Sequence, residues 1–109
     1  MAAPWLMVAT AYTLDCAGCS GVPASGRLAE PYAVTVAASP AWALGTCLEA
    51  KLDGVTWTRL SVEDRGGAID HPAELDVLVP TREVARGWGR RTVKVRYCDD
   101  YTRTYRRKP

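Results

Sequence analysis

The sequence predicts an all-β protein, a small closed barrel of six strands with one short helix near residues 81–87. Short stretches rich in apolar and β-branched residues recur along the chain, separated by turns that contain Gly or Pro. No segment shows the alternation of strands with longer helices that builds a parallel α/β sheet. With 109 residues, 48% hydrophobic and 24% charged, the chain is long enough for one core and ordinary in composition.

Six segments carry the strand pattern. They cover residues 5–13, 32–39, 45–52, 55–64, 74–80 and 91–98. Between the third and fourth segments, Asp53-Gly54 predicts a hairpin turn because both residues accept positive φ. In the fifth segment Leu75 and Val77 flank Asp76, which predicts a buried apolar face with Asp76 on the opposite face.

Residues 81–89 are the one stretch with helical character. Thr81 can cap the helix, Glu83 favours its first turn, and Gly87 can end it. After the last strand the chain turns basic, so we expect a barrel over residues 1–98 followed by a basic C-terminal tail, 99–109. We favour a solvated tail over a nucleic-acid arm, since no second basic patch or aromatic ladder accompanies it.

The four cysteines make an even set, which allows three disulfide pairings in an oxidising setting. They are Cys16, Cys19, Cys47 and Cys98. The Cys16-x-x-Cys19 pair resembles half of a zinc site, but the other two cysteines are widely separated singletons. We therefore favour disulfides or buried thiols, and we predict no metal and no cofactor.

The N-terminal segment lacks a charged n-region, and its apolar stretch is too short and interrupted for a signal peptide or a membrane span. The chain is then either a mature or trimmed form, or a protein that leaves the cytoplasm without a signal, as a phage-encoded protein does. The net charge of +2 is too small to indicate a class of binding partner. The function therefore has to be inferred from motifs.

Two aspartates, Asp64 and Asp76, stand on either side of Gly66-Gly67. Paired carboxylates are the usual apparatus for cleaving glycosidic bonds, where one donates a proton to the leaving oxygen. Mid-strand Asp76 suits the acid, Asp64 its partner, and the glycines allow close approach of a ligand. The structural alternative is turn chemistry at Asp64 and a surface ion pair between Asp76 and Arg65 or Arg82.

Six stretches taken in order resemble a known family. They are "ATAYT" at 9–13, "CSGVPASG" at 19–26, "ALGT" at 43–46, "VEDRGGAI" at 62–69, "ELDVL" at 74–78 and "GWGRRTVKV" at 87–95. Together they resemble the 3D domain, a double-psi β-barrel similar to the catalytic barrel of membrane-bound lytic transglycosylase A and to resuscitation-type muralytic proteins. One of the three aspartates for which the domain is named is replaced, since Ala38 or Ser39 occupies its place.

This resemblance implies a peptidoglycan lytic transglycosylase, which cuts between N-acetylmuramic acid and N-acetylglucosamine and leaves a 1,6-anhydro end. Asp76 corresponds to the general acid and base, and Asp64 to the residue that tunes it or binds substrate. Thr10, Tyr12 and Gly26 correspond to the cleft lining, to which we add Gly66 and Gly67. The implied setting is the bacterial cell wall, reached outside the cell or from a phage virion.

Two other functions remain open from the sequence. The first is a non-catalytic barrel that binds glycan or forms part of a larger assembly such as a phage tail, which the replaced aspartate favours. The second is water-mediated glycoside hydrolysis, which needs a separate general base. Glu74, Asp70 or Asp99 could fill that role, and nothing in the sequence selects among them. His71 lies in an expected turn, and we interpret it as exposed.

Overall fold

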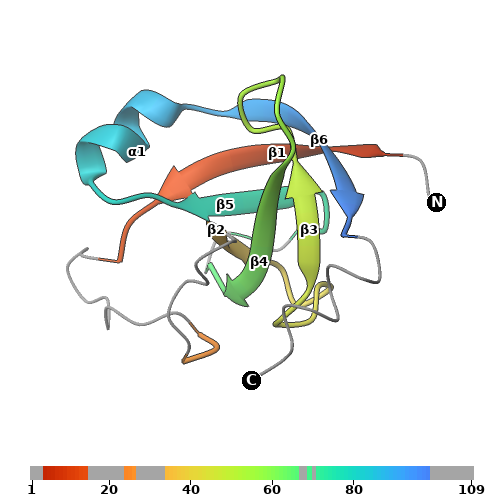
Figure 1. Cartoon of the computed structure of the whole chain (residues 1–109). Helices are drawn as coiled ribbons and strands as arrows, with labels where there is room; N and C mark the ends of the chain where they lie inside the picture. The colour runs from red at the N-terminus through yellow and green to blue at the C-terminus, as the bar shows by residue number, and fades with distance from the viewer. Residues whose placement is uncertain (1–3, 15–23, 27–33, 67–68, 70, 99–109) are drawn as a thin grey trace.

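The computed structural model describes residues 4–14, 24–26, 34–66, 69 and 71–98. The strands are β1 (Trp5–Tyr12), β2 (Val34–Ala38), β3 (Cys47–Ala50), β4 (Thr58–Asp64), β5 (Glu74–Leu78) and β6 (Arg91–Tyr97). They close into a barrel in the order β1-β5-β2-β4-β3-β6 (Figure 1). The pairs β1–β5 and β2–β4 are parallel and the others antiparallel. The prediction of an all-β six-stranded barrel with one short helix is confirmed, and this barrel fits the double-psi class.

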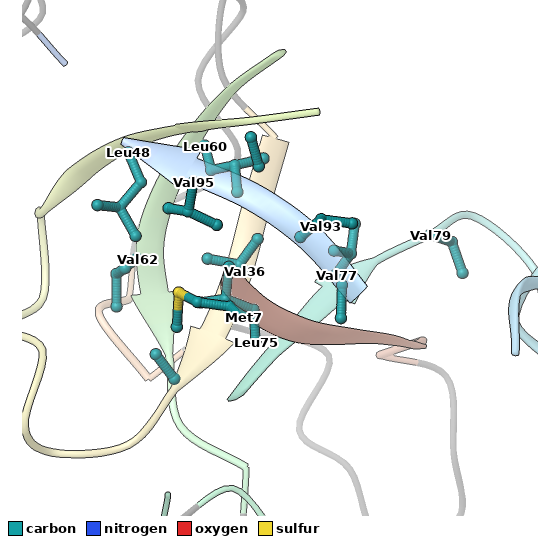
Figure 2. Packing of buried hydrophobic residues seen from close by; sticks show 13 residues of the cluster. Met7, Val36, Leu48, Leu60, Val62, Leu75, Val77, Val79, Val93 and Val95 are labelled. Carbon is teal, nitrogen blue, oxygen red and sulfur yellow. The ribbon is translucent and has the colours of Figure 1, made fainter. Parts of the chain in front are cut away.

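Strict alternation along the strands fills the barrel with aliphatic side chains. Side chains from different strands, such as Met7, Val36 and Leu48, meet inside it (Figure 2). On β5, Leu75 and Val77 are buried, as their alternation predicts. The buried cluster comprises Met7, Ala9, Val36, Ala38, Leu48, Ala50, Leu60, Val62, Leu75, Val77, Val79, Val93 and Val95. Burial of each large member of this cluster stabilises the fold by about 1.5–3 kcal/mol. The interior of the barrel is therefore the main source of its stability.

The predicted hairpin turn joins β3 to β4. Gly54 has φ 83°, and the Asp53 carboxylate accepts hydrogen bonds from the N–H groups of Val55 and Thr56, both at 2.8 Å. The bond from Thr56, followed by that from Val55, holds the pKa of Asp53 below its usual range. The turn therefore matches the Asp-Gly signal in the sequence.

Helix α1 (Arg82–Trp88) follows β5 and leads into β6. The Thr81 hydroxyl accepts a hydrogen bond from the Val84 N–H, as the capping prediction requires. The predicted end at Gly87 is wrong, because the helix runs through Trp88 and ends at Gly89, whose φ is 71°. A glycine that can adopt positive φ two residues further on stops the helix instead.

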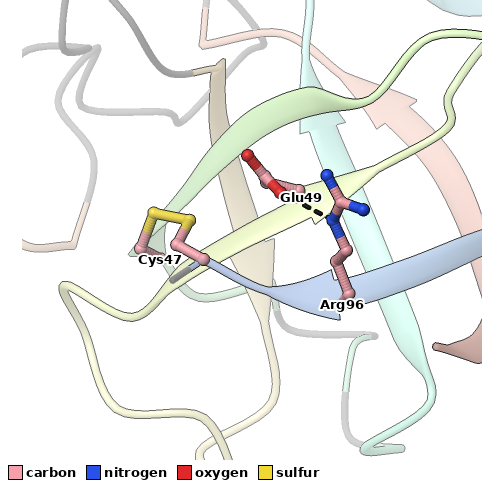
Figure 3. Close-up of polar contacts among 4 residues, drawn as sticks. Cys47, Glu49 and Arg96 are labelled. Atoms are coloured by element: carbon pink, nitrogen blue, oxygen red, sulfur yellow. Dashed lines mark hydrogen bonds and ion pairs between the residues drawn. A yellow bond between two sulfur atoms is a disulfide. The ribbon is translucent and has the colours of Figure 1, made fainter. Parts of the chain in front are cut away.

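One disulfide ties the start of β3 to the residue after β6. Cys47 and Cys98 are bonded, with 5.5 Å between their Cα atoms (Figure 3). The Cys98 N–H also donates to the Cys47 carbonyl at 3.3 Å. This selects one pairing among those left open by the sequence. Cys16, Cys19 and the expected tail at 99–109 lie outside the described residues.

Removing the Cys47–Cys98 bond should destabilise the barrel. The two cysteines are 51 residues apart in sequence, and closing a loop of that length removes unfolded-chain entropy worth about 4 kcal/mol. We expect Cys47→Ala with Cys98→Ala to lose about that much free energy of unfolding in a urea titration.

Glu49→Gln is the matched control for this measurement. It breaks the nearby ion pair between Glu49 and Arg96 (2.7 Å, Figure 3) but keeps the disulfide. Since that pair is partly exposed, the loss should stay below about 1 kcal/mol. Equal losses in the two variants would contradict a specific contribution from the disulfide.

Candidate functional site

A β-bulge in the β2–β4 pair decides where Asp64 points. Val36 pairs with Val62, but the next residue, Ala37, pairs with Asp64, so Glu63 is left without a register partner. Ala37 lies between two core residues and therefore faces outward. Its partner Asp64 faces outward too, whereas an unbroken register would turn Asp64 inward with Val62.

Asp64 and Asp76 lie on the same outer face of the barrel. Ala37 is the register partner of both, with Asp76 on β5 and Asp64 on β4. Two strand spacings separate their Cα atoms, or about 10 Å. On the far side of Asp76, Thr10 is its partner on β1. The register thus sets Thr10, Asp76, Ala37 and Asp64 in one row across four strands.

Asp64 is buried and its carboxylate is fully engaged. One oxygen accepts from the Tyr12 hydroxyl at 2.7 Å. The other accepts from the N–H groups of Ala24 and Arg65, both at 2.8 Å. Burial, followed by the hydrogen bond to Asp64, raises the pKa of Tyr12 well above its usual range, so this hydroxyl is a permanent donor. Asp64 is arranged to hold neighbouring groups in place.

Asp76 is half-buried and more open than Asp64. The Thr10 hydroxyl donates to its Oδ1 at 2.8 Å. Burial raises the pKa of Asp76, the Thr10 hydrogen bond opposes that rise, and the negative charge of Asp64 adds to it. With Oδ1 engaged by a donor, the acid proton is expected on Oδ2. A carboxyl with a raised pKa and one oxygen open to the cavity is chemically suited to donate a proton.

Asp76 lines an open cavity of about 250 Å³ on the outer face of β1 and β5. Polar and apolar side chains both contribute to its walls. The lining residues are Val8, Thr10, Ala11, Ile69, Glu74, Asp76 and Arg90. A cavity of this size and openness can hold part of a ligand and leave the rest on the open surface.

The other residues predicted from the sequence, Tyr12, Gly26 and Gly66, support the site from positions beside the cavity. Tyr12 contacts Asp64 and is not part of the cavity wall. Gly26 has φ 76° and closes the turn whose Ala24 N–H binds Asp64. A Cβ on Gly66 would stand 2.8 Å from Cγ1 of Ile69, so this glycine lets Ile69 close over it and form the wall. Gly67 lies outside the described residues.

Arg65 and Trp42 hold together the segments that adjoin the strands of the two aspartates. The Arg65 guanidinium donates to the carbonyl of Trp42 at 2.8 Å and, at longer range, to that of Ala38. The Trp42 indole N–H donates to the Pro72 carbonyl at 2.8 Å, just before β5. The alternative that Arg65 pairs with Asp76 is wrong, because its guanidinium is directed to backbone carbonyls.

Three residues have a place in the structure that the sequence did not indicate. Glu74 was expected only as one of three candidate bases, and Arg90 and Glu63 were not expected to contribute. Glu74 could have been singled out, because it shares the outward face of β5 with Asp76. Arg90 directly precedes β6 and lines the cavity because β6 pairs with β1, and no sequence signal predicts that pairing. Glu63 is buried and accepts a hydrogen bond from Ser61. Of the other proposed bases, Asp70 and Asp99 lie outside the described residues, and His71 is exposed.

Among the described residues no helix is long and apolar enough to cross a membrane. Within the same residues, no three His, Cys, Asp or Glu side chains gather in a way that could hold a metal ion.

Asparagine at position 76 should stabilise the protein above the ordinary pKa of aspartate, 3.8. Below that pH Asp76 is protonated in both the native and unfolded chains. As the pH rises from there toward the higher native pKa, the unfolded chain loses its proton first, and parent stability falls. Asp76→Asn avoids this cost and can still accept from Thr10.

We therefore expect Asp76→Asn to melt above the parent at neutral pH, with the difference vanishing near pH 3, in thermal unfolding followed by circular dichroism. A destabilisation of the same size at both pH values would contradict the argument.

Comparison with known proteins shows which fold the chain shares. No protein-family model matches it, and no curated protein sequence matches it. It is similar to the crystal structure of the apo form of an expansin from Clavibacter michiganensis, with a TM-score of 0.62, 21% identity and 90% of this chain covered. An aspartate-to-asparagine mutant of that expansin in complex with cellohexaose matches with a TM-score of 0.54, 17% identity and 90% coverage. The chain covers 52% of each of these structures, so the likeness shows the barrel fold and is confined to about half of the expansin.

Proposed function

We propose that the chain is a glycan-binding β-barrel module whose binding site is the cavity on the outer face of β1 and β5. The observation that carries this proposal is the convergence of Thr10, Asp76, Glu74 and Arg90 on one open cavity of about 250 Å³. Sugars present hydroxyls that need several donors and acceptors at once, and a mixed wall of this kind supplies both. Ile69 and Val8 add apolar surface for the faces of the sugar rings.

Two further lines support a polysaccharide as the ligand. The expansin that shares the barrel fold was solved in complex with cellohexaose, a linear glucan. The ordered motifs that resemble the 3D domain, among them "VEDRGGAI" and "ELDVL", imply peptidoglycan instead. Of these two glycans we propose peptidoglycan, since the motif resemblance includes Asp64 and Asp76 themselves.

Catalysis is the second candidate, and the state of Asp76 favours it. A carboxyl that keeps its proton above the usual pH range can donate it to a glycosidic oxygen as the C–O bond breaks. In a lytic transglycosylase the muramyl 6-hydroxyl then attacks the anomeric carbon and returns its proton to Asp76. This reaction needs one accessible carboxyl, which suits a site where Asp64 is buried and fully hydrogen-bonded.

The proposed setting is the bacterial cell wall, outside the cell or at the surface of a phage virion, where tail proteins would be partners. The Cys47–Cys98 disulfide supports an oxidising environment of that kind.

Sedimentation with insoluble glycan tests the binding proposal. We expect the parent chain to sediment with purified peptidoglycan, and a Thr10→Ala plus Glu74→Ala variant to lose most of that binding. Glu83→Gln, on the exposed face of α1, is the matched control and should bind like the parent. If the parent stays in the supernatant with both peptidoglycan and cellulose, glycan binding is wrong.

Mass spectrometry of the soluble products separates the two candidates. If the barrel is catalytic, the parent releases 1,6-anhydromuramyl fragments, and Asp76→Asn lowers their rate of release by at least about 100-fold while it still sediments with the glycan. If the parent binds and releases no fragments, the barrel is a binding module without catalysis.

A further inference from the structure

The cavity contains a guanidinium group that the fold does not use. Arg90 is exposed and lines the cavity beside Asp76. Among the described residues, no hydrogen bond or ion pair engages its side chain. A cation kept free at the wall of a binding cavity is available to a ligand.

The neighbouring arginine shows what a structural role looks like in this segment. Arg91 donates from Nε to the carbonyl of Trp88 and from Nη1 to that of Leu52, both at 3.2 Å. Its guanidinium also stacks 3.8 Å from the centre of the Trp88 ring. Arg91 therefore fixes the start of β6 to the end of α1. Arg90 has no such structural contact among the described residues.

Arg90 lies at the same cavity as the catalytic candidate, Asp76. Ala9 pairs with Arg91, the first residue of β6, and Arg90 directly precedes that strand, while Thr10, which also lines the cavity, pairs with Asp76 on β5. Glu74 lies one outward-facing row away, opposite Val8. The cavity is therefore positive at Arg90 and negative at Glu74.

We propose that Arg90 is a specificity-determining residue that binds a carboxylate group carried by the glycan. This inference rests on the proposed glycan-binding function. The planar guanidinium forms two parallel hydrogen bonds with a carboxylate, a geometry that a hydroxyl cannot match. Glu74 repels the same carboxylate, so the two residues together orient the sugar chain and select acidic glycans over neutral ones.

Binding to one glycan with its carboxylates free or blocked tests this proposal. The probes are soluble peptidoglycan fragments and the same fragments after conversion of their carboxyl groups to neutral amides. By calorimetry we expect the parent to bind the free-acid fragments about tenfold more tightly than the amidated ones at low ionic strength. Arg90→Gln should abolish that preference and bind the amidated fragments as the parent does.

Two further variants sharpen the result. Lys94→Gln removes the same charge from the outward face of β6, about 13 Å along the strand and outside the cavity, and it should keep the preference. Glu74→Gln should increase it. A preference that survives in Arg90→Gln overturns the proposal. Equal binding of both fragment forms by the parent overturns it while glycan binding stands, and binding of neither form overturns both.

Discussion

The register shift between Val36 and Ala37 is the constraint on which the site depends. In a sheet with one face committed to the core, a slip of one residue reverses every side chain beyond it. The bulge confines that reversal to the last residue of β4, so Val62 stays in the core while Asp64 reaches the outer face. Without it, Asp64 would be an unpaired charge inside an aliphatic barrel, and Asp76 would lose the neighbour that helps raise its pKa.

Around that row the charged residues divide into those that build the site and those left open to a ligand. Asp64 accepts three hydrogen bonds, and Arg65 and Arg91 direct their guanidinium groups to backbone carbonyls. Their side chains hold loops and strand ends in place. Asp76 and Arg90 keep free polar atoms at the cavity. The structural residues hold the rigid strands and their ends in place, and those strands in turn position Asp76 and Arg90 at the cavity.

The shared fold and the local chemistry carry different weight in the functional argument. The expansin barrels are about one-fifth identical to this chain, so they establish how the backbone closes. The case for a glycan comes from the cavity, from the raised pKa of Asp76 and from the ordered motifs in the sequence. Ala37 occupies the position between Asp64 and Asp76 in the row, so no third carboxylate stands between them.

The sequence by itself determined the strands, the hairpin at Asp53-Gly54, the capped helix and the outward face of Asp76, because alternation, turn chemistry and capping act over a few residues. The expected end of α1 at Gly87 is two residues early, because either glycine could stop the helix and the positive φ falls at Gly89. Only the tertiary structure decided the pairing of Cys47 with Cys98, the bulge that turns Asp64 outward and the presence of Arg90 at the cavity with Thr10 and Asp76. These features depend on which strands become neighbours and in what register, and that is settled by closing the barrel around one shared core.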